Sequence, residues 1–367
     1  MDRSASSPSP ERAPEAVYND IYIKTILKQG IIDLVLDQLT DKVHWIIVFV
    51  VTPAISLLGL VGNTFSAIVL TKHGFKKSSN VLLFSLAISD SLFIIGINGP
   101  PKPMYEFGPG GFAYPEPTAR VLYYLYQLTD SINWTTGPTS LMIPVFVMVE
   151  RLIAVFLPLR FHSIVTVRRT VIAVVVLFAG TIIMQIYIRT WFKFAYVFDS
   201  SRNISVGIAM RTDSYWAQRH ISKGLEIFVN SVFVMIIFVG CGCIAIGVKM
   251  KMVARKRLEM TMGQKEANNS RTTKMLLCLC IFYTFACFPT LLTAVVPTFM
   301  VFPVFQDKPN FRSIGVFIYH IYKLVFCING SCNFLIYVAT NAKFRETFLN
   351  LLQCQRTNSR SGNISRM

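Results

Sequence analysis

Ionisable side chains inside apolar runs are the residues of this sequence with the strongest chemical meaning. Glu150 and Arg151 stand side by side near the end of one apolar run, and Asp90 lies near the middle of another. A charge in or near a bilayer is costly, so it needs a partner or a functional reason to be there. The Glu150–Arg151 pair is therefore interpreted as a functional site, and the alternative is a simple anchor at the membrane edge.

Further polar side chains fall inside the apolar runs at two expected depths. The deeper group, near the middle of the membrane or just inside it, comprises Asn63, Asp90, Ser140, Asn329 and Asn333. The shallower group lies one or two turns nearer the outer face and comprises Asp130, Asn133, His320 and Lys323. Two such groups predict a pocket that opens to the outside. The alternative for Lys323 is a side chain that reaches the lipid headgroups.

The composition indicates an integral membrane protein. The chain has 367 residues, of which 53% are hydrophobic and 15% charged, with a mean hydropathy of +0.50, whereas a soluble domain carries about 25% charged residues. The net charge of +17 would suit a nucleic-acid ligand, but the basic residues lie mostly in short connections between apolar runs. Of the eight cysteines, all but Cys354 lie in apolar runs, and their spacing predicts no metal site.

Seven apolar runs are long enough, at about 20 residues, to cross a bilayer as helices. The predicted spans are 45–70, 80–99, 120–149, 170–189, 223–248, 274–300 and 313–339. Basic residues concentrate in alternate connections, most of all between Lys249 and Lys274, where eight Lys or Arg residues occur. The positive-inside rule places these connections in the cytoplasm and the N-terminus outside. The sequon at Asn203 lies in an outer loop and is the predicted glycosylation site.

The predicted fold is an all-α membrane protein. Residues 1–43 form an extracellular tail, in which 21–39 is weakly amphipathic, and 44–340 form the seven-helix bundle. The tail resembles no secretory signal peptide, so the first span is expected to act as its own signal anchor. Apolar residues at helical spacing predict an amphipathic membrane-surface helix over 341–354. Cys354 at its end is a candidate palmitoylation site, or an ordinary free cysteine, and 355–367 form a polar cytoplasmic tail.

From residue 44 to 354 the chain resembles the rhodopsin-like (class A) G protein-coupled receptors. The residues that carry the resemblance are Gly62-Asn63, Leu86 to Asp90, Glu150-Arg151, Pro158-Leu159, Cys287-Phe288-Pro289, Asn329, Asn333 to Tyr337 and Phe344-Arg345. Each motif is weak alone, but together they occur in the right order and in the right spans. Within the class, the chain is most similar to gastropod chemosensory receptors and related invertebrate peptide receptors.

The resemblance implies a role for each matching residue. Glu150 would hold Arg151 in the silent state, and Arg151 would meet the G protein in the active state. Tyr337 would swing inward on activation, and Cys287, Phe288 and Pro289 would form the switch in span six. An allosteric sodium ion would be held by Asp90, Ser140, Asn329 and Asn333, since oxygen ligands around one carboxylate suit a hard cation.

Several family features are missing. Tyr126 stands where the family has the cysteine that ties span three to the next outer loop, and residues 190–222 contain no cysteine. That loop must therefore be held by something else. Cys287 replaces the aromatic switch residue, and Phe334 replaces the proline before the last tyrosine of span seven.

The departures from the family pattern also reduce the range of candidate ligands. Asn133 stands at the position where amine receptors carry an aspartate, and Cys327 stands where opsins carry the retinal lysine. The expected ligand is a small polar odorant or a short peptide, and Lys323 would take a carboxylate or pair with Asp130. The expected pocket comprises Asp130, Asn133, Trp134, Gly137, Thr290, Tyr319, His320 and Lys323.

The function predicted from these observations is a receptor that binds an extracellular ligand and activates a heterotrimeric G protein through movement of spans three and six. A transporter or channel is the alternative, because it also needs charges inside the membrane, although the seven spans show no internal duplication. No nucleophile elbow, zinc motif or paired-carboxylate site indicates an enzyme.

Overall fold

The computed structural model describes the backbone of residues 42–106, 111–200, 202–260, 267–288 and 309–364. Side chains are described in these ranges except at 106, 226–234, 254, 256–260, 267–274, 309–319 and 354–364. The chain falls into two compact units that divide between Val50 and Val51. Every interaction considered below lies within the second unit.

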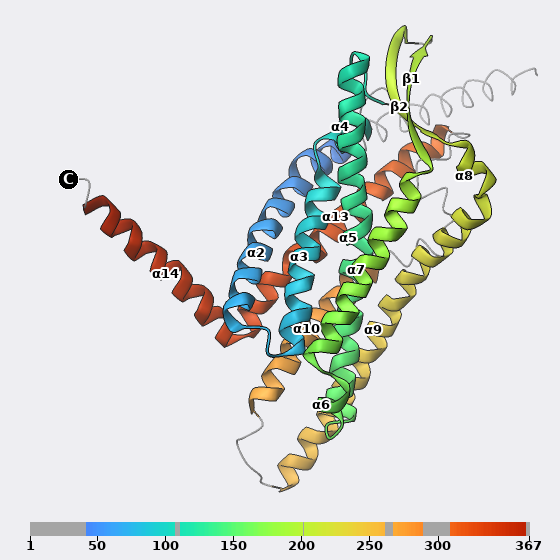
Figure 1. Cartoon of the computed structure of the whole chain (residues 1–367). Helices are drawn as coiled ribbons and strands as arrows, with labels where there is room; N and C mark the ends of the chain where they lie inside the picture. Colours follow the sequence, from blue (N-terminus) through green and yellow to red (C-terminus); the bar gives the residue numbers. More distant parts are fainter. Residues whose placement is uncertain (1–41, 107–110, 201, 261–266, 289–308, 365–367) are drawn as a thin grey trace, which may run out of the picture. The chain divides into compact units, whose positions relative to one another are not determined.

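Helices dominate the described chain (Figure 1). In chain order they are η1 (Ile47–Val51), α2 (Thr52–His73), α3 (Ser78–Asn98), α4 (Pro101–Glu106), α5 (Glu116–Phe156), α6 (Phe161–Ile164), α7 (Val167–Arg189), α8 (Asp213–Ala217), α9 (Arg219–Met260), α10 (Ala267–Cys287), α13 (Pro309–Thr340) and α14 (Ala342–Ile364). Strands β1 (Phe192–Asp199) and β2 (Ile204–Arg211) lie between α7 and α8.

Six helical segments among the described residues are long and apolar enough to span a membrane. They are Lys42–His73, Ser78–Tyr105, Glu116–Phe156, Val167–Arg189, Met235–Val253 and His320–Thr340. A shorter apolar helix, Met275–Cys287, covers the first part of the predicted span 274–300, whose remainder from 289 onward lies outside the described residues. The predicted fold class, a helical membrane bundle, is confirmed.

The helix boundaries differ from the predicted ones in two places. Helix α5 is much longer than the predicted span 120–149 and runs without a break through Pro138 and Pro144. This length places Asp130 and the Glu150–Arg151 pair on one continuous helix. Helix α14 contains the predicted amphipathic helix but continues to Ile364, where composition predicted an irregular tail.

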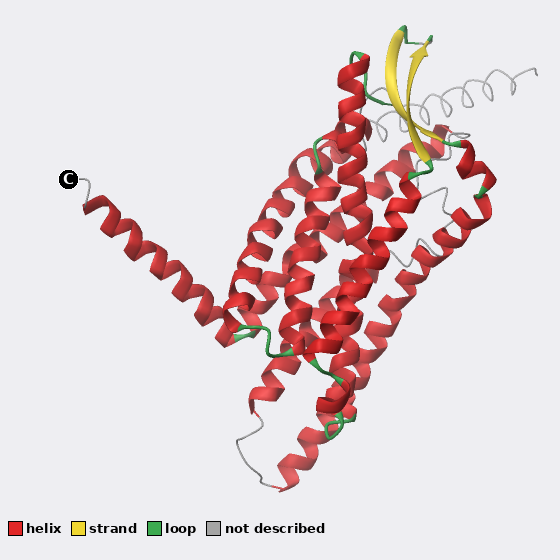
Figure 2. Cartoon of the chain, viewed as in Figure 1, coloured by secondary structure: helices red, strands yellow, loops and turns green. Residues whose placement is uncertain are grey.

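The connection 189–223, which the sequence presented as a plain loop, contains the antiparallel hairpin of β1 and β2 (Figure 2). The register pairs Phe192 with Arg211 at the open end and Asp199 with Ile204 at the turn. Asn203 in the turn has a φ of 54°, a left-handed conformation that asparagine adopts more readily than most residues.

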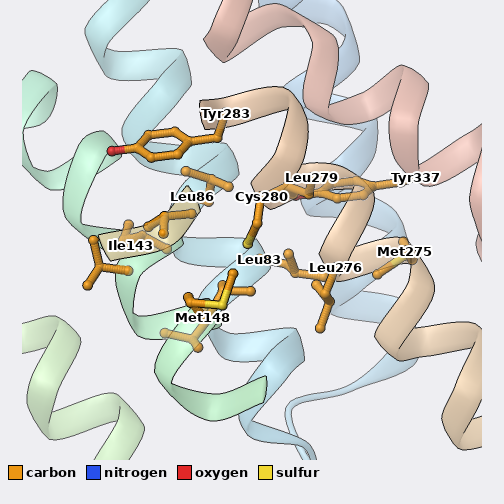
Figure 3. Close-up of a cluster of buried hydrophobic side chains, with 14 of the residues drawn as sticks. Leu83, Leu86, Ile143, Met148, Met275, Leu276, Leu279, Cys280, Tyr283 and Tyr337 are labelled. Carbon is orange, nitrogen blue, oxygen red and sulfur yellow. The ribbon is translucent and has the colours of Figure 1, made fainter. Parts of the chain in front are cut away.

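The apolar core joins α3, α5, α9, α10 and α13 toward one end of the bundle. Leu83, Leu86, Ile143 and Met148 meet Leu276, Leu279 and Tyr283 of α10 and Tyr337 of α13 (Figure 3). The Tyr283 hydroxyl donates to the carbonyl oxygen of Leu141 at 3.0 Å, which ties α10 to α5 across this core. Helices α3 and α5 pack along each other most extensively, so α5 is the element around which the other helices assemble.

Candidate functional site

The Glu150–Arg151 pair closes onto the first turn of α3. Arg151 Nη2 forms an ion pair with Glu150 Oε1 and donates to Ser79 Oγ at 2.8 Å. Ser78 Oγ and Ser79 Oγ both donate to Glu150 Oε1, at 2.9 and 2.7 Å. The sequence predicted that Glu150 holds Arg151, but it did not predict the two serines. They hold the pair against a second helix, and we call these four residues the cytoplasmic lock, after the side of the membrane on which the charge pattern is expected to place them.

Three buried polar atoms, two in the cytoplasmic lock and one on α13, have no hydrogen-bond partner among the described residues. They are Glu150 Oε2, Arg151 Nε and the hydroxyl oxygen of Tyr337. Arg151 and Tyr337 are both buried, and the Tyr337 ring packs on Phe344 of α14 with centroids 5.5 Å apart. Unsatisfied buried polar groups are costly and call for an explanation. A movement of the helices that gives these atoms hydrogen-bond partners would therefore recover part of this free-energy cost.

The predicted span-six switch is only partly described. Cys287 is fully buried in the core, whereas the neighbouring Phe288 is exposed. Pro289 lies outside the described residues, so its place in the switch stays a prediction. Tyr283 and Cys287 fill the core from α10, one turn apart.

Two of the predicted sodium-binding residues, Ser140 and Asn333, contact Asp90, which is 0% exposed. Ser140 donates a short hydrogen bond to Asp90 Oδ1, and Asn333 Nδ2 donates to Asp90 Oδ2 at 2.6 Å. Asn329 is also buried on α13. A buried carboxylate in contact with a hydroxyl and a side-chain amide offers the hard oxygen donors that an alkali cation prefers, so these residues fit the ion. Asn333 would have to present its oxygen in place of its nitrogen.

Neighbouring polar contacts hold the helices around Asp90 in register. Asn63 of α2 donates from Nδ2 to the carbonyl oxygen of Gly330 at 2.9 Å, and the Ser89 hydroxyl lies 2.6 Å from that of Thr139. These bonds join α2 to α13 and α3 to α5. The deep polar group of the sequence therefore forms connections between helices.

A second ion cluster lies at the opposite end of α5. Asp130 Oδ1 accepts from Lys102 Nζ of α4 at 3.1 Å, and Asp130 Oδ2 accepts from Arg189 Nη2 of α7 at 2.8 Å. Arg189 Nη1 also donates to Gln127 Oε1 at 2.6 Å. We call these four residues the outer ion cluster. The sequence offered Asp130 as one of two partners for Lys323, the other being a ligand carboxylate, whereas here the Asp130 carboxylate is shared by Lys102 and Arg189.

The remaining predicted pocket residues are spread over several elements. His320 and Lys323 are buried on α13, and Asn133 is buried on α5 one turn from Asp130, with its Oδ1 unpaired. Trp134 is 38% exposed, and Gly137 lies against the Phe93 ring, 3.4 Å from where a Cβ would be. Thr290 lies outside the described residues, as does the side chain of Tyr319.

An aromatic cluster holds the hairpin where the family has its disulfide. Tyr126 stacks on Tyr105 with ring centroids 4.7 Å apart, and Phe112 packs edge-on to both rings. The backbone of Phe112 pairs with Gly207 of β2 through two hydrogen bonds of 2.9 Å. The Tyr105 hydroxyl accepts from the backbone N–H of Ala209 at 3.2 Å. Tyr126 thus packs against the two residues, Tyr105 and Phe112, that bond to the hairpin.

Cation–π contacts of Arg211 also stabilise the open end of the hairpin. The Arg211 guanidinium lies 4.2 Å from the ring centroids of both Phe192 and Tyr215. Burial lowers the pKa of Arg211 from its ordinary value, and the nearby Tyr215 raises it in part. An arginine stays charged at physiological pH in such a setting, so the cation–π contacts persist and join β1 to β2 and α8.

Replacement of Tyr126 by alanine is expected to lower the stability of the protein by about 2 kcal/mol, because it removes one ring of the aromatic cluster. Thermal unfolding of purified protein in detergent measures the effect. Tyr124→Ala is the matched control, since Tyr124 is 62% exposed on the same helix. Equal unfolding temperatures for the two variants would show that the cluster does not hold the hairpin.

The two predicted modification sites remain predictions. Asn203 is exposed in the hairpin turn, where a glycosyl group would meet no steric obstacle within the hairpin. The side chain of Cys354 is outside the described set, although its backbone lies within α14.

A family model described as serpentine type 7TM GPCR chemoreceptor Srw matches residues 50–355. No curated protein matches the chain.

Proposed function

Because the chain belongs to the serpentine seven-transmembrane chemoreceptor family Srw, we propose that it binds an extracellular ligand and passes the signal to a heterotrimeric G protein. The family is one of G protein-coupled chemoreceptors, which makes the chain a multi-pass membrane receptor rather than an enzyme. The ligand pocket would lie at the outer end of α5, and the coupling site would lie at the Glu150–Arg151 end.

The observation that carries the proposal is the cytoplasmic lock. Arg151 is buried and tied to Glu150 and Ser79, an arrangement that withholds its charge from any partner outside the bundle. Hydrogen bonds to charged groups contribute about 1.5–3 kcal/mol each. The lock therefore favours the silent conformation by an amount that a ligand and a G protein can overcome together.

Activation would separate α10 from the core and release Arg151. Tyr283 and Leu276 of α10 are buried against Met148 and Ile143 of α5 (Figure 3), so movement of α10 opens the region beside the lock. Arg151 Nε and the Tyr337 hydroxyl, both unpaired in the silent state, would then gain partners. The gain of hydrogen bonds offsets part of the cost of opening the core.

Within this proposal, we assign the chain to the rhodopsin-like (class A) receptors, and within that class to a type similar to the gastropod chemosensory receptors and related invertebrate peptide receptors. The support for this assignment is the position of Glu150–Arg151 at the end of α5 and the meeting of Asp90 with Ser140 and Asn333. A sodium ion held by Asp90, Ser140, Asn329 and Asn333 would neutralise the buried carboxylate and favour the silent state. The N-terminus would lie outside the plasma membrane, with α14 at the cytoplasmic face.

Replacement of Glu150 by glutamine tests the proposal. The variant is expected to raise basal G protein activation roughly tenfold, because loss of one charge-assisted bond shifts a two-state equilibrium by about 1.4 kcal/mol or more. Ser79→Ala is expected to raise it less, since Ser78 still donates to Glu150. Nucleotide exchange on G proteins in membranes, at matched surface expression, is the measurement.

Ser91→Ala is the matched control for Ser79→Ala, because Ser91 bonds only the carbonyl oxygen of Ala87 in its own helix. If Glu150→Gln leaves basal exchange at the wild-type level with every G protein tested, while the protein reaches the surface, the lock does not restrain coupling and the proposal fails.

A further inference from the structure

Two buried cysteines meet at the contact between α9 and α10. Cys243 of α9 is 8% exposed, and Cys280 of α10 lies fully buried in the middle of the same apolar core (Figure 3). Both are free cysteines, and their thiol groups are hydrogen-bonded to each other. A disulfide needs two cysteines whose side chains already point toward one another, and this pair meets that condition.

The packing of the two helices agrees with this pairing. A Cβ at Gly240 of α9 would lie 3.1 Å from Thr284 Cγ2 of α10, so the helices approach each other closely at this level. Cys243 follows Gly240 by about one turn, and Cys280 precedes Thr284 by about one turn. Since α9 and α10 run in opposite directions along their contact, one further turn brings Cys243 opposite Cys280.

Helix α9 is itself held firmly in the core. Its side chains Ile236, Val239 and Ile246 are buried in the same apolar cluster. A Cβ at Gly242 would lie 2.6 Å from Met148 Sδ of α5, so α9 also lies very close to α5. A covalent bond between α9 and α10 would therefore tie α10 to the core from which, under the proposed function, it separates on activation.

The cysteine pair lies near the cytoplasmic lock. Arg151 acts electrostatically on Cys280, and Cys280 acts in the same way on Tyr337. The proposed function gives Arg151 and Tyr337 new partners when α10 moves. A bond that fixes Cys280 in place therefore acts beside the two side chains that this movement would release.

We propose that Cys243 and Cys280 form a redox-sensitive pair whose disulfide holds α10 on α9 and keeps the receptor silent. The inference rests on the proposed function for the meaning of α10 movement. The oxidant is an apolar organic hydroperoxide, such as an oxidised lipid. Both cysteines lie in apolar helical segments, Met235–Val253 and Met275–Cys287, which a lipid-soluble oxidant enters more readily than a charged one.

The reaction needs no reactant other than the hydroperoxide. The sulfur of Cys243, the more exposed of the two, attacks the terminal peroxide oxygen, and the O–O bond breaks. Cys243 becomes a sulfenic acid, and the oxidant leaves as an alcohol that carries the thiol proton. The Cys280 sulfur then attacks the Cys243 sulfur, so the S–S bond forms and the S–O bond breaks with release of water. The two sulfurs together lose two electrons, which reduce the peroxide.

Oxidation of the purified full-length protein in detergent tests whether the bond forms. The probe is cumene hydroperoxide, and the products are mapped by mass spectrometry of unreduced peptides. The expected product links Cys243 to Cys280 and unfolds at a temperature roughly 3–8 °C higher than the reduced protein. Cys280→Ala is expected to lose both the link and the temperature shift.

The chain offers a matched control for this experiment. Cys241 and Cys278 are exposed cysteines, each two residues from one member of the pair on the same helix. A Cys241→Ser, Cys278→Ser double variant is expected to form the link as the wild type does. If Cys280→Ala does not fold, Cys243→Ala takes its place, and peptide mapping of the double variant identifies the linked cysteines without either of them.

Nucleotide exchange on G proteins in membranes tests the effect of the bond. The Glu150→Gln receptor supplies the raised basal signal, and cumene hydroperoxide is expected to lower that signal at least about fivefold. Dithiothreitol is expected to restore it. Glu150→Gln combined with Cys243→Ala is expected to keep its exchange under the same oxidation, which separates the effect of this bond from damage to the G protein.

The outcomes that overturn the inference are distinct from those that overturn the proposed function. Oxidation of single cysteines without a Cys243–Cys280 link overturns the inference. A link that forms and leaves the exchange of Glu150→Gln unchanged also overturns it, because α9 and α10 would then move together. A Glu150→Gln receptor with no raised exchange before oxidation refutes the proposed function instead, and the peptide map and unfolding temperature then decide on the disulfide alone.

Discussion

Replacement of Arg151 by alanine is expected to abolish G protein activation, both basal and ligand-induced. Arg151 is the buried cation at the centre of the cytoplasmic lock, and its guanidinium bonds Glu150 and Ser79 in the silent state. Under the proposed function, this is the charge that would become available to the G protein when the lock opens. Its loss removes the contact itself, so opening the lock no longer produces a signal.

The decisive form of this experiment combines two variants. Glu150→Gln alone is expected to raise basal nucleotide exchange, and Glu150→Gln with Arg151→Ala is expected to return exchange to background, a loss of about tenfold or more. Surface level is matched through an epitope tag on the N-terminus. Arg168→Ala is the control, because Arg168 is exposed at the start of α7. A double variant that still activates a G protein would place the coupling charge elsewhere.

Replacement of Gly96 by alanine is expected to prevent stable folding. A Cβ at Gly96 would lie 2.5 Å from the backbone nitrogen of Asn133 and 2.9 Å from the carbonyl oxygen of Thr129. These are backbone atoms of α5, so no side chain can turn away to make room. Helices α3 and α5 would have to separate along their main contact, at a cost of about 1–3 kcal/mol or more.

The effect of Gly96→Ala is measured by surface expression in cells and by thermal unfolding of whatever protein can be purified. Gly180→Ala is the matched control, since a Cβ at Gly180 in α7 would meet nothing within 4 Å. A Gly96→Ala receptor as abundant and as stable as Gly180→Ala would show that α3 and α5 do not need their close approach. The same close approach positions Asn133 next to the outer ion cluster.

Several functional residues could be named from the sequence because their neighbours lie on the same helix or follow a known spacing. The pairing of Glu150 with Arg151, which are adjacent in the chain, was implied by the family resemblance. Asp90, Ser140 and Asn333 could be grouped by their expected depth in three spans, and the structure brings them within hydrogen-bonding distance. Depth along a span is simple to estimate, because each residue advances a helix by about 1.5 Å.

Other functional contacts were not predictable in this way. Lys102 and Arg189 lie at the ends of predicted spans, where a basic residue suggests only a contact with headgroups or water. Ser78 and Ser79 resemble ordinary residues at the start of a helix, yet both bond Glu150. Whether such a side chain faces the bundle depends on the rotation of each helix about its axis, which is determined by packing against its neighbours.

The sequence by itself determined that this protein is a helical membrane bundle, which connections are basic, and which charges lie inside the spans, because apolar length and charge pattern are local properties of the chain. Only the tertiary structure decided which partners those charges have. It joined Asp130 to Lys102 and Arg189, turned the predicted loop 189–223 into a hairpin, and placed Tyr126 in an aromatic cluster with Tyr105 and Phe112. These contacts link residues far apart in the chain, and their geometry arises from the way α3, α5 and α7 pack together.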